Sequence, residues 1–374
     1  MTKIKPAAPD VKTLETIFLP GLLSSKVYKI DTPKVKYKLD QNESPFDWPE
    51  DLKEKICQDL CQTSWNRYPA AHARDVEDLI AEYLNLENGT VLLSPGSNHL
   101  LGIILSNMTK KLPGKLVIAR PSFVLYESHC RNEGIPYETW NLNEDLQYDL
   151  NALPELPAGS IVLFASPNNP VGNTLAKSDL KKLLVDFPEV IFISDEAYFE
   201  FSDENTTDLL AEHSNLLIMR TFSKTMGAAG IRLGYLIGHS SYIGELRKQM
   251  LPFLVNQFAY IAAKHALSNS DFLSQVAKTT QLIVDERSKV ETALRQAGET
   301  KNFEVIPSKS NFILLRWKED VVRAKVYSFL IENDILIRDI SRGPNLSGCM
   351  RLSIGSKEAN QAVIKVFSSA ELPS

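Results

Sequence analysis

Short apolar runs separated by amphipathic stretches fill the middle of the chain. The runs lie at residues 91–93, 115–119, 161–165, 190–194, 216–219 and 233–237. Between most of them, apolar residues recur at helical spacing, as at residues 121–134 and 177–186. Short strands that alternate with helices are typical of a parallel sheet covered by helices on both faces. The pattern therefore predicts an α/β fold.

The pattern changes after about residue 251. A helical stretch at residues 275–296 is long enough to bridge two domains. It is followed by predicted strands at 311–316, 335–340 and 350–354, with predicted helices at 321–333 and 357–368. This arrangement predicts a second, smaller α+β domain. The opening thirty residues contain prolines and lysines without firm periodicity, and we expect an arm that needs a partner surface to be ordered.

Composition and charge exclude some classes of function. The 374 residues include 46 acidic and 41 basic side chains, well mixed along the chain, and no basic stripe suggests a nucleic-acid partner. The N-terminus lacks the apolar core of a signal peptide, and no window is long enough for a membrane span. Cys57 and Cys61 lie four residues apart in a helical pattern, where we expect half-buried apolar side chains rather than metal ligands. We therefore expect a cytoplasmic protein.

Several polar residues follow the predicted strands, where ligands of open α/β sheets bind. Gly96, Ser97 and Asn98 form a glycine turn before an apolar helical stretch, and the free N–H groups of a helix start can hold a phosphate. Such turns are common, so this feature is weak by itself. Asn169 lies in SPNNPVG between two prolines. Its side chain either forms hydrogen bonds with the backbone of its own loop or presents an amide donor to a ligand at a fixed place.

Asp195 directly follows the apolar run at residues 190–194, so its carboxylate is expected to be partly desolvated at the end of the sheet. Such a group needs a cationic or strongly donating partner. Two candidates remain open at this point: a structural arginine, or the protonated ring nitrogen of a cofactor. Tyr198 lies three residues further on and can point toward the same site.

The stretch MRTFSKTMGAAGIRLGY follows the apolar run at residues 216–219. A lysine after a strand is usually a solvated surface group, but Lys224 stands next to Ser223, with Arg232 eight residues beyond it. Serine and arginine side chains both bind anions, and the small residues between them allow a bulky group to approach the backbone.

Together these residues supply an amine nucleophile, phosphate ligands and a carboxylate for a ring nitrogen. This combination indicates pyridoxal 5′-phosphate, with Lys224 bonded to the cofactor and Asp195 facing its ring nitrogen. A nucleotide-binding oxidoreductase is disfavoured, because no G-x-G-x-x-G follows an early strand and no G-x-x-x-x-G-K-[ST] is present.

The chain resembles the fold-type-I pyridoxal-phosphate aminotransferases, and among them the histidinol-phosphate aminotransferases. The segments that carry the resemblance span residues 38–355 in the family's order: KLDQNESP, RYPA, SPNNPVG, DEAYFEF, TFSKTMGAAGIRLG and RDISRGPNLSGCMRLSIG. The most specific is the S-K-x-x-x-x-A-G-x-R-x-G pattern at residues 223–234. The resemblance implies an aspartate-aminotransferase-like fold, in which a mainly parallel seven-stranded sheet forms the large domain. We expect an arm at 1–30, a large domain at 46–275 and a small domain at 31–45 and 276–374.

The resemblance also implies a role for each matching residue. Lys224 would be the lysine bonded to the cofactor, with Asp195, Tyr198, Asn169 and Phe123 around the ring. The residues implied to hold the cofactor phosphate are Gly96, Ser97, Asn98, Ser223, Arg232 and, from the neighbouring subunit of a homodimer, Tyr68. The residues implied to contact the substrate are Arg351, Arg338, Asn42 and Asn169.

The activity that the resemblance implies is amino transfer between histidinol phosphate and 2-oxoglutarate or glutamate, a step of histidine biosynthesis. Two departures bear on the substrate: Phe123 and Phe18 stand where the family often has tyrosine. An aromatic or broad-range amino-acid aminotransferase and a threonine-phosphate decarboxylase-like enzyme therefore remain alternatives. A cofactor-sensing regulator of this fold is disfavoured, because an arm of about thirty residues leaves no room for a helix-turn-helix.

Overall fold

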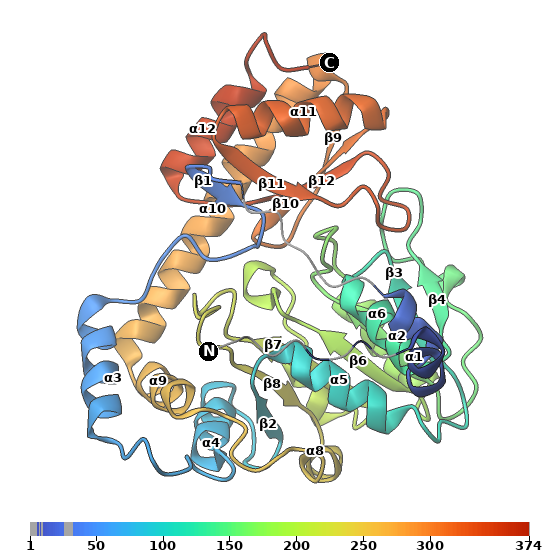
Figure 1. The fold of residues 1–374 in the computed structure, drawn as a ribbon, viewed down its shortest axis with the longest axis vertical. Helices are drawn as coiled ribbons and strands as arrows, with labels where there is room; N and C mark the ends of the chain where they lie inside the picture. Colours follow the sequence, from blue (N-terminus) through green and yellow to red (C-terminus); the bar gives the residue numbers. More distant parts are fainter. Residues whose placement is uncertain (1–5, 7, 9, 26–32, 374) are drawn as a thin grey trace.

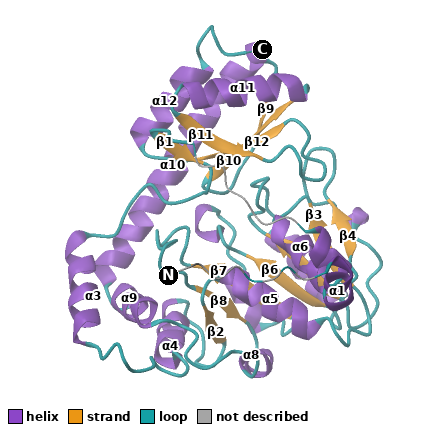
Figure 2. Cartoon of the chain, in the orientation of Figure 1, coloured by secondary structure: helices purple, strands orange, loops and turns teal. Residues whose placement is uncertain are grey.

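The structure of the protein, a computed structural model, describes residues 6, 8, 10–25 and 33–373. It contains a large sheet between layers of helices and a smaller sheet at the opposite end of the molecule (Figures 1 and 2). The long helix α10 (Ser270–Lys301) runs from one part to the other. It is longer at both ends than the helix expected at residues 275–296.

Within the described residues, seven strands form the large sheet in the order β2-β8-β7-β6-β5-β3-β4. Their bounds are β2 (Val91–Ser94), β3 (Leu116–Arg120), β4 (Glu138–Asn141), β5 (Ile161–Ala165), β6 (Ile191–Asp195), β7 (Leu216–Thr221) and β8 (Gly234–Ile237). Strand β8 is antiparallel to both its neighbours, and the other pairs are parallel. The expected mainly parallel seven-stranded sheet is confirmed.

Helices cover both faces of this sheet, because successive side chains of each strand point to opposite sides. One face packs against α3 (Glu50–Gln62), α4 (Arg74–Tyr83), α7 (Lys177–Asp186) and α9 (Gln257–Leu267). The other packs against α5 (Ser97–Met108), α6 (Val124–Glu133) and α8 (Ser240–Arg247). Burial on both faces explains why the strands are almost continuously apolar rather than alternating.

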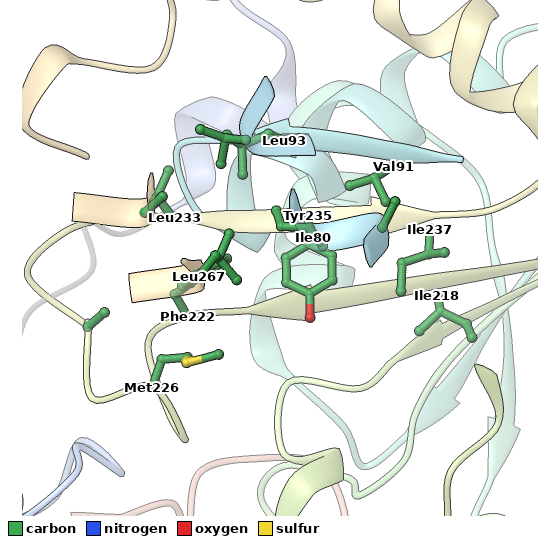
Figure 3. Close-up of a cluster of buried hydrophobic side chains, with 14 of the residues drawn as sticks. Ile80, Val91, Leu93, Ile218, Phe222, Met226, Leu233, Tyr235, Ile237 and Leu267 are labelled. Atoms are coloured by element: carbon green, nitrogen blue, oxygen red, sulfur yellow. The ribbon is translucent and has the colours of Figure 1, made fainter. Parts of the chain in front are cut away.

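The hydrophobic cluster on the α4 and α9 face reaches the turn that follows β7. In Figure 3, Ile80 of α4 and Leu267 of α9 lie near the β8 side chains, and Phe222 and Met226 lie at one end of the cluster. Phe222 and Met226 are 2% and 6% exposed. Because these two residues flank Lys224 in the sequence, their burial fixes the turn that carries it.

The smaller sheet has the order β1-β11-β12-β10-β9 among the described residues. Its strands are β1 (Tyr37–Leu39), β9 (Phe303–Ile306), β10 (Phe312–Trp317), β11 (Ile335–Asp339) and β12 (Cys349–Ser353). The sheet packs against α10, α11 (Asp320–Glu332) and α12 (Lys357–Phe367). Strand β1 is parallel to β11, whereas the other pairs are antiparallel. Pairing of β1 brings an early segment of the chain to the small sheet.

Two short helices, α1 (Val11–Ile17) and α2 (Pro20–Ser24), precede β1, and α2 packs against α6. Gly21 is essential to the contact of α2 with α6, because a Cβ atom there would lie 1.8 Å from the carbonyl oxygen of Arg131. The expected arm at 1–30 includes residues 1–5, 7, 9 and 26–30, which lie outside the described residues. The boundaries of the arm and of the two domains stay predictions.

One expectation about the surface was wrong. Cys57 and Cys61 are exposed rather than half-buried, because Leu52 and Ile56 form the buried face of α3. No group of side chains suited to hold a metal ion occurs among the described residues. Likewise, none of the helices in the described ranges combines the length and apolar character that crossing a bilayer requires.

Candidate active site

The residues expected at the site come together where the parallel strands end. The strand register places Ala165 of β5, Asp195 of β6 and Met219 of β7 side by side. The segments that leave these strands line a cavity of about 580 Å³. The expected site residues in its wall are Asn42, Ser97, Asn98, Phe123, Asn169, Asp195, Tyr198, Ser223, Lys224, Arg232 and Arg351.

Lys224 presents its amine to this cavity from the turn after β7. Its Nζ donates hydrogen bonds to the backbone carbonyls of Gln41 (3.0 Å) and Asn42 (3.1 Å). Burial lowers the pKa of the amine to about 7, and the positive charges of Arg351 and Arg232 act in the same direction. A substantial fraction of Lys224 is therefore an uncharged, nucleophilic amine near neutral pH.

Asp195 is buried at the end of β6. Its Oδ2 accepts a 2.6 Å hydrogen bond from the hydroxyl of Tyr126, and its Oδ1 accepts a 3.1 Å hydrogen bond from the N–H of Ala197. Burial raises the pKa of the carboxyl to about 6, although both hydrogen bonds act to lower it.

The structural arginine that remained a candidate partner of Asp195 does not pair with it in the described part of the chain. Arg220 instead forms a buried ion pair with the adjacent Glu196, at 2.7 Å. Within the described residues, Asp195 is thus a buried carboxylate held by two hydrogen bonds and by no arginine.

A cradle of hydrogen-bond donors, formed by Ser97 at the start of α5, Ser223 and Arg232, lies in the cavity wall. Gly96 has a φ of +86°, and a Cβ atom there would lie 2.8 Å from Nη2 of Arg232. Nη1 of Arg232 donates to Oγ of Ser223 at 3.4 Å and to the carbonyl of Ala229 at 3.1 Å. A helix start, a hydroxyl and a guanidinium thus surround one point, and this donor set suits a phosphate group.

The opposite wall of the cavity comes from the small sheet. Arg351 of β12 donates from Nη1 to Oδ1 of Asn169 at 2.6 Å and from Nη2 to the carbonyl of Asp40 at 2.8 Å. Asn42, which follows β1, donates from Nδ2 to the hydroxyl of Tyr198 at 3.0 Å. These bonds hold the two sheets together around the site.

Comparison with known proteins identifies the family. The sequence pattern of the family described as aminotransferase class I and II matches residues 34–367. The chain belongs to the class I and II aminotransferases.

Individual relatives of this aminotransferase agree in length and fold. The chain is 33% identical over 354 residues to histidinol-phosphate aminotransferase 2 of Nitrosococcus oceani, with 93% of this chain and 95% of the relative covered. It is 32% identical over 348 residues to the histidinol-phosphate aminotransferase of Pyrococcus furiosus, covering 92% and 96%. The crystal structure of the histidinol-phosphate aminotransferase of Sinorhizobium meliloti in complex with pyridoxal-5′-phosphate superposes with a TM-score of 0.78. That match has 22% identity and covers 94% and 98% of the two chains, so it supports the fold.

Three expected site residues of the aminotransferase do not line the cavity directly. Gly96 lies against the guanidinium of Arg232, which does line the cavity. Arg338 of β11 is in register with Arg351 on the neighbouring strand. Tyr68 is 80% exposed and stacks on Phe253 with ring centroids 4.6 Å apart. The expectation that Tyr68 reaches a neighbouring subunit stays a prediction.

The sequence alone did not reveal every residue of the cavity wall. Tyr126 lies three residues after Phe123, so both occupy one face of the start of α6. Their rings make an edge contact at 5.7 Å. This three-residue spacing is the feature of the sequence from which Tyr126 could have been predicted to lie at the cavity. Glu43 also lines the cavity, and its only signal was its place beside Asn42.

Proposed function

We propose that this aminotransferase uses pyridoxal 5′-phosphate and that its site residues act on it as expected from the sequence. The observation that carries the proposal is the placement, in one cavity wall, of the Lys224 amine, whose pKa is about 7, and the buried Asp195 carboxylate, which has no cationic partner among the described residues. The cradle formed by Ser97, Ser223 and Arg232 fits the phosphate of the same molecule. When bound, the cofactor supplies an aldehyde that bonds to amines and a ring that accepts electrons from the substrate's Cα.

The side chains around the cavity divide the remaining work. Asp195 would hold a proton on the ring nitrogen, and Tyr126 keeps the carboxylate oriented through its 2.6 Å hydrogen bond. Phe123 would stack on the ring, with Asn169 and Tyr198 beside its hydroxyl. Lys224 would be the general base at the substrate's Cα, because its pKa lies near the working pH.

We propose histidinol phosphate as the amino donor and 2-oxoglutarate as the acceptor. Relatives that are about 30% identical over most of the chain carry the name histidinol-phosphate aminotransferase, which supports this substrate. Arg351 offers a guanidinium that binds either a phosphate or a carboxylate through two parallel hydrogen bonds. One anion site of this kind suits both substrates of a ping-pong reaction.

We further propose a cytoplasmic homodimer in which Tyr68 of one subunit completes the phosphate site of the other. The exposure of Tyr68 beside Phe253 supports this. Mixing the Lys224→Ala and Tyr68→Ala proteins, each expected to be inactive alone, tests it, because a hybrid dimer regains one intact site. Recovery of about a quarter of the wild-type activity is expected after random exchange of subunits, whereas no recovery would reject a shared site.

Half-reaction spectroscopy tests the activity and the donor. Single amino donors are mixed with the cofactor-loaded protein, and conversion of the bound cofactor to its amine form is followed by absorbance. Histidinol phosphate is expected to react faster than phenylalanine, and amino transfer to 2-oxoglutarate should release no carbon dioxide. Preference for phenylalanine would assign an aromatic aminotransferase. Carbon dioxide release from threonine phosphate would assign a decarboxylase.

A further inference from the structure

Glu43 is the second carboxylate in the cavity wall, after Asp195, within the described residues. Both oxygens of Asp195 already accept hydrogen bonds from the protein. Glu43 makes one ion pair in the same part of the chain, with Lys38 at 3.4 Å, and the side chains of Glu43 and Lys38 are 51% and 46% exposed. Such exposed pairs contribute little to stability. The Glu43 carboxylate can therefore exchange this partner for a ligand.

The backbone that carries Glu43 is fixed in relation to Lys224. The N–H of the preceding Asn42 donates to Oγ of Ser353 at 2.8 Å, and its carbonyl accepts hydrogen bonds from Asn311 and Lys224, both at 3.1 Å. The charge of Glu43 acts on the Lys224 amine and raises its pKa against the effect of burial. The backbone that carries Glu43 is thus anchored, and its carboxylate is a negative group near the reacting amine.

The proposed substrates differ in what they can offer such a group. Histidinol phosphate carries an anion and an imidazole ring with an N–H donor, whereas 2-oxoglutarate and glutamate carry a second carboxylate and no ring. Arg351 can hold the anion in each case, so it does not tell these substrates apart. A carboxylate accepts a hydrogen bond from an imidazole N–H and disfavours another anion nearby.

We propose that Glu43 is a specificity-determining residue, whose carboxylate accepts a hydrogen bond from the ring N–H of an imidazole-bearing amino donor. This inference rests on the proposed function and assigns a protein contact to the imidazole ring of the donor, which Arg351 does not bind. When 2-oxoglutarate binds with one carboxylate at Arg351, its second carboxylate offers Glu43 no hydrogen-bond donor and is disfavoured near it.

The test compares two donors in the cofactor-loaded wild-type and Glu43→Gln proteins. One is histidinol phosphate, and the other is 2-amino-3-phenylpropyl phosphate, in which a phenyl ring without an N–H replaces the imidazole. Loss of the negative charge on the residue 43 side chain, which accepts the hydrogen bond, should raise KM for histidinol phosphate about fivefold. KM for the phenyl analogue should stay the same, and KM for 2-oxoglutarate should stay the same or fall. Glu43→Ala should show at least as large a change.

Glu50→Gln is the matched control, because it removes the same charge from an exposed site of α3. It should leave all three KM values unchanged. If the wild type transfers the amino group of histidinol phosphate but Glu43→Gln leaves the ratio of the two donors' KM values unchanged, the role of Glu43 is overturned and the proposed function stands. If the wild type transfers amino groups from other donors but not from histidinol phosphate, both the proposed substrate and the role of Glu43 are overturned.

Discussion

The guanidinium of Arg351 lies 2.6 Å from the side-chain oxygen of Asn169, so a strand of the small sheet is hydrogen-bonded to the loop that follows β5 in the large sheet. The same guanidinium donates to the carbonyl of Asp40. Arg351 therefore lies at the boundary of the two sheets, where a substrate anion would compete with these two acceptors for its N–H groups.

Arg351→Lys is expected to raise KM for both the amino donor and 2-oxoglutarate by about 10- to 100-fold, because an ammonium cannot form two parallel hydrogen bonds to one anion. Steady-state kinetics with each substrate varied in turn measures the effect. Arg316→Lys on β10 is the control, since Arg316 pairs with Glu304 outside the cavity. Unchanged KM values in Arg351→Lys would contradict the anion-binding role.

Covalent incorporation of pyridoxal 5′-phosphate into the cofactor-free protein is expected to depend on pH through Lys224. Its amine has a pKa of about 7, so the reactive neutral fraction rises about tenfold per pH unit below 7 and levels off above it. The measurement is the rate at which the adduct trapped by borohydride appears on Lys224. Lys224→Ala should form no adduct and show no amino transfer. A rate that still climbs between pH 8 and 10 would mean that the amine is not perturbed.

Gly96→Ala is expected to weaken cofactor binding. The new Cβ atom would lie 2.8 Å from Nη2 of Arg232 and would displace the guanidinium from the phosphate cradle. Loss of one charge-assisted hydrogen bond corresponds to an increase in Kd of about 10- to 100-fold. Fluorescence titration of the cofactor-free protein with pyridoxal 5′-phosphate measures it.

Gly89→Ala separates backbone strain from the effect on Arg232. Gly89 also has a φ of +86°, but no atom lies within 4 Å of its would-be Cβ position. Both substitutions should lower thermal stability by at least about 1 kcal/mol, because both force alanine to a positive φ. The loss should be larger for Gly96→Ala, because the ψ of Gly96 is 154°, in a region essentially restricted to glycine. Equal Kd values in the two variants would show that the cradle does not depend on Gly96.

Local sequence patterns predicted much of the large sheet. The apolar runs at 161–165 and 216–219 are strands because burial on both faces requires continuous apolar side chains. β4 (Glu138–Asn141) was not among the expected strands, since it lies at the edge of the sheet and two of its four residues are exposed. β1 (Tyr37–Leu39) was missed for another reason. Its three residues become a strand by pairing with β11, almost 300 residues later in the sequence.

The candidate site was predictable in its residue types but not in its contacts. The positions of Lys224 and Asp195 followed from the rule that ligands bind at strand ends. The hydroxyl of Tyr126, which donates to Asp195, could not be expected, because it depends on how α6 packs over the sheet. The link between Arg351 and Asn169 likewise joins residues 182 positions apart, and no local pattern encodes such a distance.

Asp195→Asn is expected to abolish amino transfer and to stabilise the cofactor-free protein. Burial raises the pKa of Asp195 from 3.8 to about 6, so the folded protein binds this proton more tightly than the unfolded chain does. The free energy of unfolding therefore falls as the pH rises from about 4 to 6, and the charged carboxylate destabilises the fold above that range. Asparagine carries no charge at any of these pH values. Its side-chain oxygen can still accept a hydrogen bond from the N–H of Ala197, and its amide can donate one to the hydroxyl oxygen of Tyr126.

Urea unfolding of the cofactor-free proteins at pH 4 and pH 8 measures this effect. The variant should be more stable by about 1–3 kcal/mol at pH 8 and should differ little from the wild type at pH 4. With pyridoxal 5′-phosphate bound, the order at pH 8 should reverse, because a ring nitrogen that carries a proton stabilises the aspartate and gives asparagine no such benefit. A variant that is less stable than the cofactor-free wild type at pH 8 would mean that Asp195 is a structural residue whose charge already has a partner in the fold.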